Sequence, residues 1–174
     1  ELGVTTGFDV NGLLVQGGGA ICASLDVAGA QYNVSSPSAG TLSGGADVCG
    51  TDSATTLTAT ASGDANVPAG YSTVYVLTQG AGLTIVNAGA APSFDVTEDG
   101  LYTIHTLVYD ANTLDLSIVE LGVTTGFDVN GLLVQGGGAI CASLDVAGAQ
   151  FNVSSPSAGT LSGGADVCGT DSAT

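Results

Sequence analysis

The alternation of apolar and polar residues predicts short strands along most of the chain. Residues 71–78 and 101–109 are rich in β-branched and aromatic side chains, which favour strands. Residues 56–61, in which Thr alternates with apolar residues, predict a shorter strand, and so do residues 83–86 and 93–96, which are bounded by Gly, Pro, Asn or Asp. Strands that recur about every ten residues, with little helix between them, predict an all-β sandwich.

One 55-residue segment occurs twice. Residues 1–55 return as residues 120–174 with a single change, Tyr32 to Phe151, so the period is 119 residues (120 − 1). A period of this length matches one complete globular domain rather than one turn of a solenoid. The Tyr/Phe change keeps the ring and drops the hydroxyl, which indicates a packing position. We therefore expect β-domains in tandem repeats of 119 residues.

The repeated segment adds further strands. Residues 21–27 and 31–35 predict two strands joined by a short turn containing glycine. Leu114, Leu116 and Ile118 alternate with polar residues and predict a strand that continues into the second copy of residues 2–6.

Each copy is also expected to contain one short helix. Val10, Leu13 and Leu14 have helical spacing, Asp9 is placed to cap the start, and Gly17 is placed to end it.

Residues 35–40 are small, polar and contain proline, which is typical of a linker. A boundary there makes residues 1–37 the C-terminal part of one repeat. Residues 38–156 then form a complete domain, and residues 157–174 begin the next.

The composition excludes several partners. The chain has no Lys or Arg, 16 acidic residues and a formal net charge of −16. Nucleic acid and anionic membrane surfaces are excluded, because both are bound through cationic side chains. The chain has no apolar run of the roughly 18 residues that cross a bilayer, so no membrane insertion is expected. The carboxylates have no Lys or Arg partner, so bound cations are expected to relieve their repulsion.

The four cysteines are Cys22, Cys49, Cys141 and Cys168, two in each copy. Zinc ligands come in close pairs, which this spacing does not provide, so disulfides and a location outside the cytosol are expected. Two pairings remain open: Cys49 with Cys141 within one domain, or Cys22 with Cys49 across a boundary. The boundary at residue 38 favours the first.

Residues 98–104 contain an acidic pair, a glycine and then Tyr102 before a long predicted strand. This pattern resembles the tyrosine corner of immunoglobulin-like and polycystic-kidney-type domains, in which the Tyr hydroxyl bonds the preceding turn. The resemblance implies an immunoglobulin-like β-sandwich. The core Trp and the cysteine pair of antibody domains are absent, and Ile104 stands at the position of the second cysteine.

Several segments resemble the tandem repeats of giant secreted surface proteins of Bacteroidota. They are Leu-Leu-Val-Gln-Gly-Gly-Gly at 13–19, Ala-Gly-Thr-Leu-Ser-Gly-Gly at 39–45, Val-Pro-Ala-Gly at 67–70 and Val-Tyr-Val-Leu at 74–77. The resemblance implies type IX secretion, an extracellular or cell-surface location, and a role in fibres, adhesion or gliding.

No catalytic residue is predicted. His105 is the only imidazole and shares one face of a predicted strand with apolar residues, so we expect a hydrogen-bonded structural role. The chain has no Gly-x-Ser-x-Gly elbow for a serine nucleophile and no lysine for Schiff-base chemistry. We expect a protein that is not an enzyme and has no organic cofactor.

Calcium is the one ligand for which the sequence offers donors, because it prefers carboxylate and carbonyl oxygens. Acidic residues in turns also serve simply as solvated turn formers. The candidate ligands are Asp9, Asn11, Glu98, Asp99, Asp110 and Asp115.

Ser53 and Ser172 lie in Asp-Ser-Ala triplets, which resemble the acceptor motif for O-glycans in Bacteroidota. An ordinary surface loop is the alternative for both.

These features together predict a load-bearing, non-catalytic repeat of an extracellular filament or cell-surface fibre whose partners are further copies of itself. Strand exchange between units is one way for such repeats to associate. The alternative is an adhesin stalk or binding module that recognises glycans or calcium.

Overall fold

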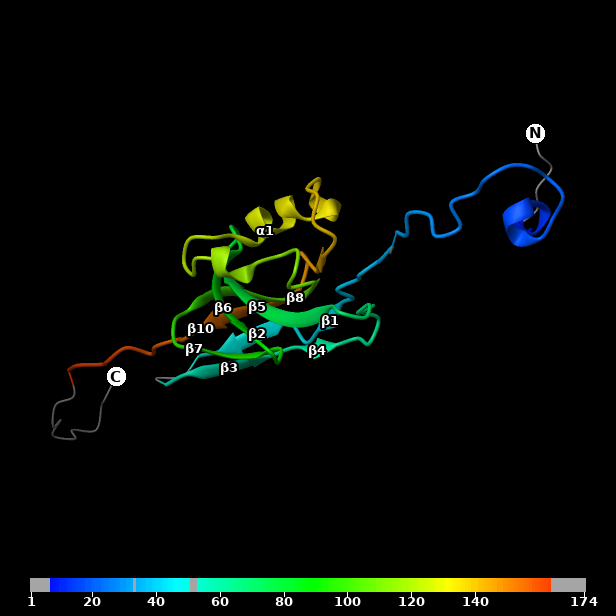
Figure 1. Ribbon diagram of the computed structural model, residues 1–174. Coiled ribbons are helices and arrows are strands. Elements are labelled where there is room, and N and C mark those ends of the chain that lie inside the picture. Colours follow the sequence, from blue (N-terminus) through cyan, green and yellow to red (C-terminus); the bar gives the residue numbers. More distant parts are fainter. Residues whose placement is uncertain (1–6, 33, 51–52, 164–174) are drawn as a thin grey trace, which may run out of the picture. The chain divides into compact units, whose positions relative to one another are not determined.

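The computed structural model describes residues 7–32, 34–50 and 53–163. The chain divides into two compact units, Glu1–Val34 and Ser35–Thr174, whereas the sequence placed the start of the complete domain at residue 38. The described part of the first unit contains two 3-10 turns, η1 (Asn11–Leu13) and η2 (Val15–Gly17). The strands lie in the second unit (Figure 1).

The second unit is mostly β. Its helical elements are η3 (Leu116–Ile118), α1 (Gly126–Leu132) and η4 (Val134–Gly136). Its strands are β1 (Leu42–Ser43), β2 (Ala46–Cys49), β3 (Thr55–Thr58), β4 (Thr60–Ala61), β5 (Ser72–Gln79), β6 (Thr84–Gly89), β7 (Ser93–Val96), β8 (Gly100–Tyr109), β9 (Ser143–Leu144) and β10 (Ala149–Ser154).

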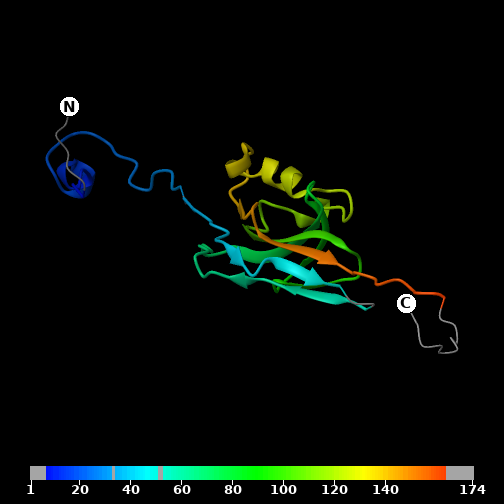
Figure 2. The ribbon, with the colours of Figure 1, turned by 180° about the vertical axis from the view of Figure 1, so that it is seen from behind.

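The main sheet has six strands, in the order β2-β10-β8-β5-β6, with β9 also paired to β8. β10 runs antiparallel to β8 and parallel to β2, and Figure 2 shows β2 and β10 side by side. The remaining strands form two small antiparallel sheets, β1-β4 and β3-β7. The pairing of β2 with β10 joins the first copy of the repeated segment to the second.

The main sheet is covered on both faces. One face packs against the β3-β7 sheet, and Leu57 and Phe94 of that sheet belong to one hydrophobic core with Ile104 and Phe151 of the main sheet. The other face packs against α1 and the loops around it through Val129 and its neighbours. The central strand β8 is therefore buried on both sides over most of its length, and β5 is buried at Leu77 and Thr78.

The strands predicted at residues 71–78, 83–86, 93–96 and 101–109 are confirmed as β5 to β8. The prediction for residues 114–118 is wrong. Asp115 accepts a hydrogen bond from the Ser117 amide at 2.9 Å, and this contact starts η3 in place of a strand. Local side-chain capping overrides the apolar alternation at this point.

The repeated segment has different structures in its two copies. The predicted strand at 31–35 forms as β10 in the second copy, but residues 31, 32, 34 and 35 are not in a strand. The predicted strand at 21–27 is reduced to β9 in the second copy and to a bridge at Ile21 in the first. In the second copy, β9 and β10 form by pairing with β8, and no such pairing is described for residues 21–27, 31, 32, 34 and 35.

The short helix forms as α1 in the second copy, and its cap differs from the prediction. Thr125 is the N-cap, and its hydroxyl accepts from the Asp128 amide at 3.1 Å. Asp128 Oδ2 accepts from the Thr125 amide at 2.9 Å, which completes a capping box. Asp9, the equivalent of Asp128, is therefore not the capping residue of an α-helix. The helix ends at Leu132, before the glycine expected to terminate it.

Replacing Asp128 by alanine removes one half of this capping box. We expect Asp128→Ala to lower the free energy of unfolding by about 1 kcal/mol, which urea denaturation followed by circular dichroism would measure. Asp9→Ala is the matched control and should change it by less than about 0.5 kcal/mol. Equal losses in the two variants would contradict this assignment of the helix cap.

Candidate functional site

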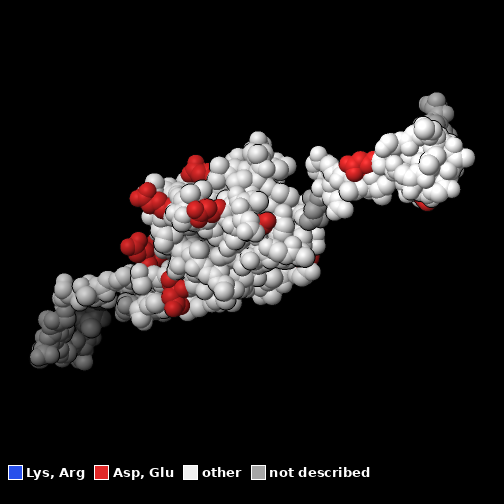
Figure 3. Space-filling model, viewed as in Figure 1, with Lys and Arg blue, Asp and Glu red and all other residues white. Residues whose placement is uncertain are grey.

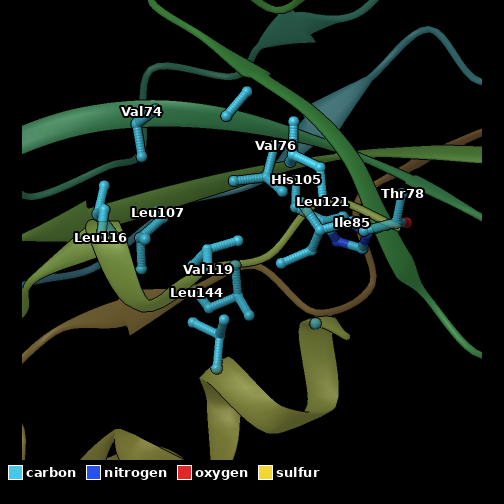
Figure 4. A pocket seen from close by; sticks show the side chains of 13 residues that line it. Val74, Val76, Thr78, Ile85, His105, Leu107, Leu116, Val119, Leu121 and Leu144 are labelled. Atoms are coloured by element: carbon cyan, nitrogen blue, oxygen red, sulfur yellow. The ribbon is translucent and has the colours of Figure 1, made fainter. Parts of the chain in front are cut away.

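An apolar cavity of about 160 Å³ lies between the main sheet and the layer that contains α1 (Figure 4). Strands β5, β6 and β8 form one wall, and the segment from η3 to α1 forms the other. Its lining includes Val74, Val76, Ile85, Leu107, Val119 and Val129.

Two polar side chains, Thr78 and His105, also line the cavity. His105 is 1 % exposed, and Thr78 beside it on β5 is fully buried. His105 Nδ1 lies 2.8 Å from the Asp145 carbonyl oxygen, and His105 Nε2 lies 2.9 Å from Thr78 Oγ1. A carbonyl oxygen only accepts, so Nδ1 carries a proton, and in the neutral ring Nε2 accepts from the threonine hydroxyl.

Burial lowers the pKa of His105, because the charged imidazolium loses its hydration inside the sheet. The hydrogen bond to the Asp145 carbonyl acts in the opposite direction. Both ring nitrogens therefore have partners in the neutral state, as expected for a structural histidine. Thr78 Oγ1 also lies 3.3 Å from the Thr103 carbonyl oxygen, which is a second and more distant acceptor for the one hydroxyl proton.

The hydroxyl of Tyr102, the residue predicted at a tyrosine corner, has two hydrogen-bond partners. Its hydroxyl donates to the Glu98 carbonyl at 3.1 Å and accepts from Gln79 Nε2 at 3.2 Å. Desolvation raises the pKa of Tyr102, and the negative charges of Glu98 and Asp99 act in the same direction. The ring is 4 % exposed and belongs to the core that faces β3 and β7.

Several candidate calcium ligands are occupied by local hydrogen bonds. Asp9 Oδ1 accepts from the Gly12 amide at 3.1 Å, and Asn11 Oδ1 accepts from Gln16 Nε2 at 2.9 Å. Asp110 Oδ1 accepts from both nitrogens of Asn112. These contacts are those of turn-forming residues.

Asp99 and Asp115 lie in the second unit, as does Asp110. Asp99 accepts from the Ser155 amide at 3.0 Å and from its hydroxyl at 2.7 Å, which ties the end of β10 to the turn before β8. The bonds from Ser117 lower the pKa of Asp115. In the described ranges, no three His, Cys, Asp or Glu side chains form a group that could hold a metal ion. Figure 3 shows the acidic side chains separated from one another over the visible surface.

Of the two candidate glycan acceptors, Ser53 is exposed in a bend before β3, and Ser172 lies outside the described residues. Three of the four cysteines are likewise among the described residues. Cys22, Cys49 and Cys141 are free thiols, and Cys168 lies outside the described part.

The predicted disulfide between Cys49 and Cys141 is not formed. Cys49 lies opposite Ser154 on β10, one position beyond the pair of Val48 with Val153. Val153 pairs with Gly100 of β8, whereas Ser143, which closely follows Cys141, pairs with Val108. Gly100 and Val108 are about 26 Å apart along the strand, and a disulfide needs Cα atoms within about 7 Å. The strand register therefore excludes this pair within one domain.

The sequence reasoning missed the contact partners of Cys141. Its thiol donates to the Ser35 carbonyl at 3.3 Å, and contact with this thiol raises the pKa of the Tyr71 hydroxyl.

The sequence also did not predict the apolar cavity. The apolar runs in β5 and β8 were the available signal, because strands with two apolar faces require a second layer.

A comparison with protein-family models, with curated proteins and with solved structures gave no match. In the part of the chain that the structure describes, no helix is long and apolar enough to cross a membrane.

The buried imidazole predicts a dependence of stability on pH. Above about pH 6.5, His105 is neutral in both the folded and the unfolded chain. Below this value the unfolded chain takes up a proton that the folded domain resists, so the free energy of unfolding falls by up to about 1.4 kcal/mol per pH unit. Urea denaturation between pH 7.5 and pH 5 would measure this fall.

The control is His105→Gln, which removes the only imidazole. We expect it to be less stable than the wild type at pH 7.5 but to have a nearly flat profile over this range, since carboxylates titrate mainly at lower pH. Parallel profiles for the two proteins would show that His105 does not cause the dependence.

Proposed function

We propose that this chain is part of a non-catalytic structural protein, an extracellular filament or cell-surface fibre built from immunoglobulin-like domains in tandem. One observation carries the proposal: the folded domain takes β2 from the first copy of the repeated segment and β10 from the second. A 55-residue copy therefore does not correspond to a domain. Each copy ends one domain and begins the next.

Burial in the two copies supports this division. Val34 is 87 % exposed, whereas its equivalent Val153 is 4 % exposed; Tyr32 is 88 % exposed and Phe151 is 3 % exposed. The first copy thus presents apolar side chains that the second copy buries in a core. This is the pattern expected if residues 7–34 close a preceding domain of the same kind.

Hydrogen bonds hold the segment that would join two such domains. Ser154 and Ser155 are held by their own domain, through the Gly50 amide at 2.8 Å and the Asp99 carboxylate. The equivalent dipeptide Ser35-Ser36 is held by the domain that follows it: Cys141 Sγ donates to the Ser35 carbonyl, and Asn66 Nδ2 to that of Ser36 at 2.6 Å.

In an array, both sets of contacts fall on the same two residues. The segment that the sequence indicates as a linker is then fixed by the domains on both sides. Force passes from one domain to the next through bonded backbone rather than through a flexible tether, which suits a load-bearing fibre.

Two further observations favour an immunoglobulin-like fold and an extracellular location. The hydrogen bond from Tyr102 to the Glu98 carbonyl is that of the tyrosine corner in immunoglobulin-like sandwiches. The absence of Lys and Arg removes every cleavage site for trypsin-type proteases, which suits an extracellular fibre.

Strand exchange is part of this proposal. The first copy carries the same apolar residues as the segment that closes the domain, so it is able to close a domain of another chain. The loop around Gln16 in the first copy has the same hydrogen bonds as the equivalent loop in the folded domain. Gln16 bonds Asn11 and both backbone groups of Leu25, and Gln135 makes the equivalent bonds in the second copy.

The repeat supplies a matched pair of variants. Phe151→Ala opens a cavity in the core, and we expect it to lower the free energy of unfolding of the domain by about 3–5 kcal/mol. Tyr32→Ala changes the equivalent, exposed residue and should have an effect below about 0.5 kcal/mol. Urea denaturation of both variants measures the difference, and similar losses would contradict the split of each copy between two domains.

Cryo-electron microscopy of the native surface material tests the function itself. We expect a continuous row with one sandwich per 119-residue period. Domains that are separated by flexible gaps would contradict a load-bearing fibre, and they would favour a stalk that carries a glycan- or calcium-binding site elsewhere.

A further inference from the structure

The two cysteines described in the folded unit each lie next to the same position of the repeat. Cys49 is opposite Ser154 in the parallel pair of β2 and β10, and the following residue, Gly50, donates its amide to the Ser154 carbonyl at 2.8 Å. Cys141 donates its thiol to the Ser35 carbonyl at 3.3 Å. Ser35 and Ser154 are one period apart and occupy equivalent positions in the two copies.

In a tandem array, this serine belongs to two domains at once. As the last residue of β10 it lies beside Cys49 of its own domain. As the first residue of the next domain it contacts the residue equivalent to Cys141 there. Its carbonyl oxygen has two lone pairs, so it can accept the Gly50 amide and the thiol together.

We propose that Cys49 of each domain and the Cys141 equivalent of the next domain form a disulfide that links consecutive domains. This inference rests on the proposed tandem array. It names the covalent contact at each joint, and it explains how these cysteines can pair although the register keeps them far apart within a domain.

Both sulfurs are accessible for this reaction. Cys49 is exposed at the end of β2, which is an edge strand of the main sheet. Cys141 is half-buried and lines a surface pocket of about 290 Å³ together with Ser35, Pro37 and Gln135. The pocket leaves room for a second sulfur beside the joint.

The oxidant is a small disulfide such as oxidised glutathione. One protein thiolate attacks it, forms a mixed disulfide and releases one glutathione thiolate; the second protein thiolate attacks the mixed disulfide and releases the other. One S–S bond forms and one breaks. The two cysteines lose two electrons to the small disulfide, and their two protons end on the glutathione thiols.

The test uses the full chain lengthened by one 119-residue period, which contains two consecutive domains and six cysteines, the four present plus two more. After folding with oxidised glutathione, the protein is alkylated in denaturant, and the modified thiols are counted by mass spectrometry. Glutathione adducts are distinguished by their mass. We expect four alkylated thiols and one disulfide, which a non-reducing digest assigns to Cys49 and the cysteine 119 positions after Cys141.

Two variants and the original chain are the controls. Cys49→Ser should leave all five remaining thiols alkylated, whereas Cys22→Ser should leave three and keep the disulfide. The 174-residue chain should retain four alkylated thiols, because its Cys49 and Cys141 lie in one domain. Six alkylated thiols in the lengthened chain, or a disulfide that survives Cys49→Ser, would overturn the proposal.

Failure of this inference is distinguishable from failure of the proposed function. A continuous row of domains in the micrographs with all thiols free would overturn the disulfide alone. A disulfide between two folded domains whose native material forms no fibre would overturn the function alone.

Discussion

The parallel pairing of β2 with β10 is the contact on which the architecture depends. It joins residues 46–49 of the first copy to residues 151–154 of the second, and β2 has no other neighbour in the main sheet. Strands paired in parallel must be joined by a long connection, and here the connection is the rest of the domain. A domain is therefore complete only when the end of one copy and the beginning of the next are both present.

The chain achieves this fold without a Lys or Arg ion pair, since it has no such residue. Several of its carboxylates are instead bonded to nearby N–H and O–H groups. Asp64 accepts from the amide and hydroxyl of Thr41, and this lowers the pKa of its carboxyl group. Asp99 bonds Ser155 in the same way. Negative charges are thus used as turn and strand-end acceptors, while apolar packing on both faces of the sheet provides the driving force.

The sequence predicted the elements whose pattern is local. β5 and β8 are long and apolar, and β7 was predicted with its observed bounds. β2 was missed because Gly45 and Ala46 give no alternating apolar signal; it forms through its partner strand. At the site, the sequence identified His105 and the cysteines as notable residues. It did not reveal the cavity or the distance between Cys49 and Cys141, because both depend on contacts between distant segments.

Comparing the two copies of the repeated segment shows which elements the segment forms by itself and which need contacts with the rest of the domain. The Gln16 loop and the Gln135 loop have the same hydrogen bonds, so this loop is encoded by the segment itself. Among the described residues, the α-helix and β10 appear in the second copy, where Val129 packs against the main sheet and Phe151 lies in the core that faces β3 and β7. A short helix and a single strand are marginal when isolated, so burial decides whether they form. The repeated segment thus leaves apolar residues exposed in one context and closes a core in the other, which is the behaviour that the proposed tandem array requires of it.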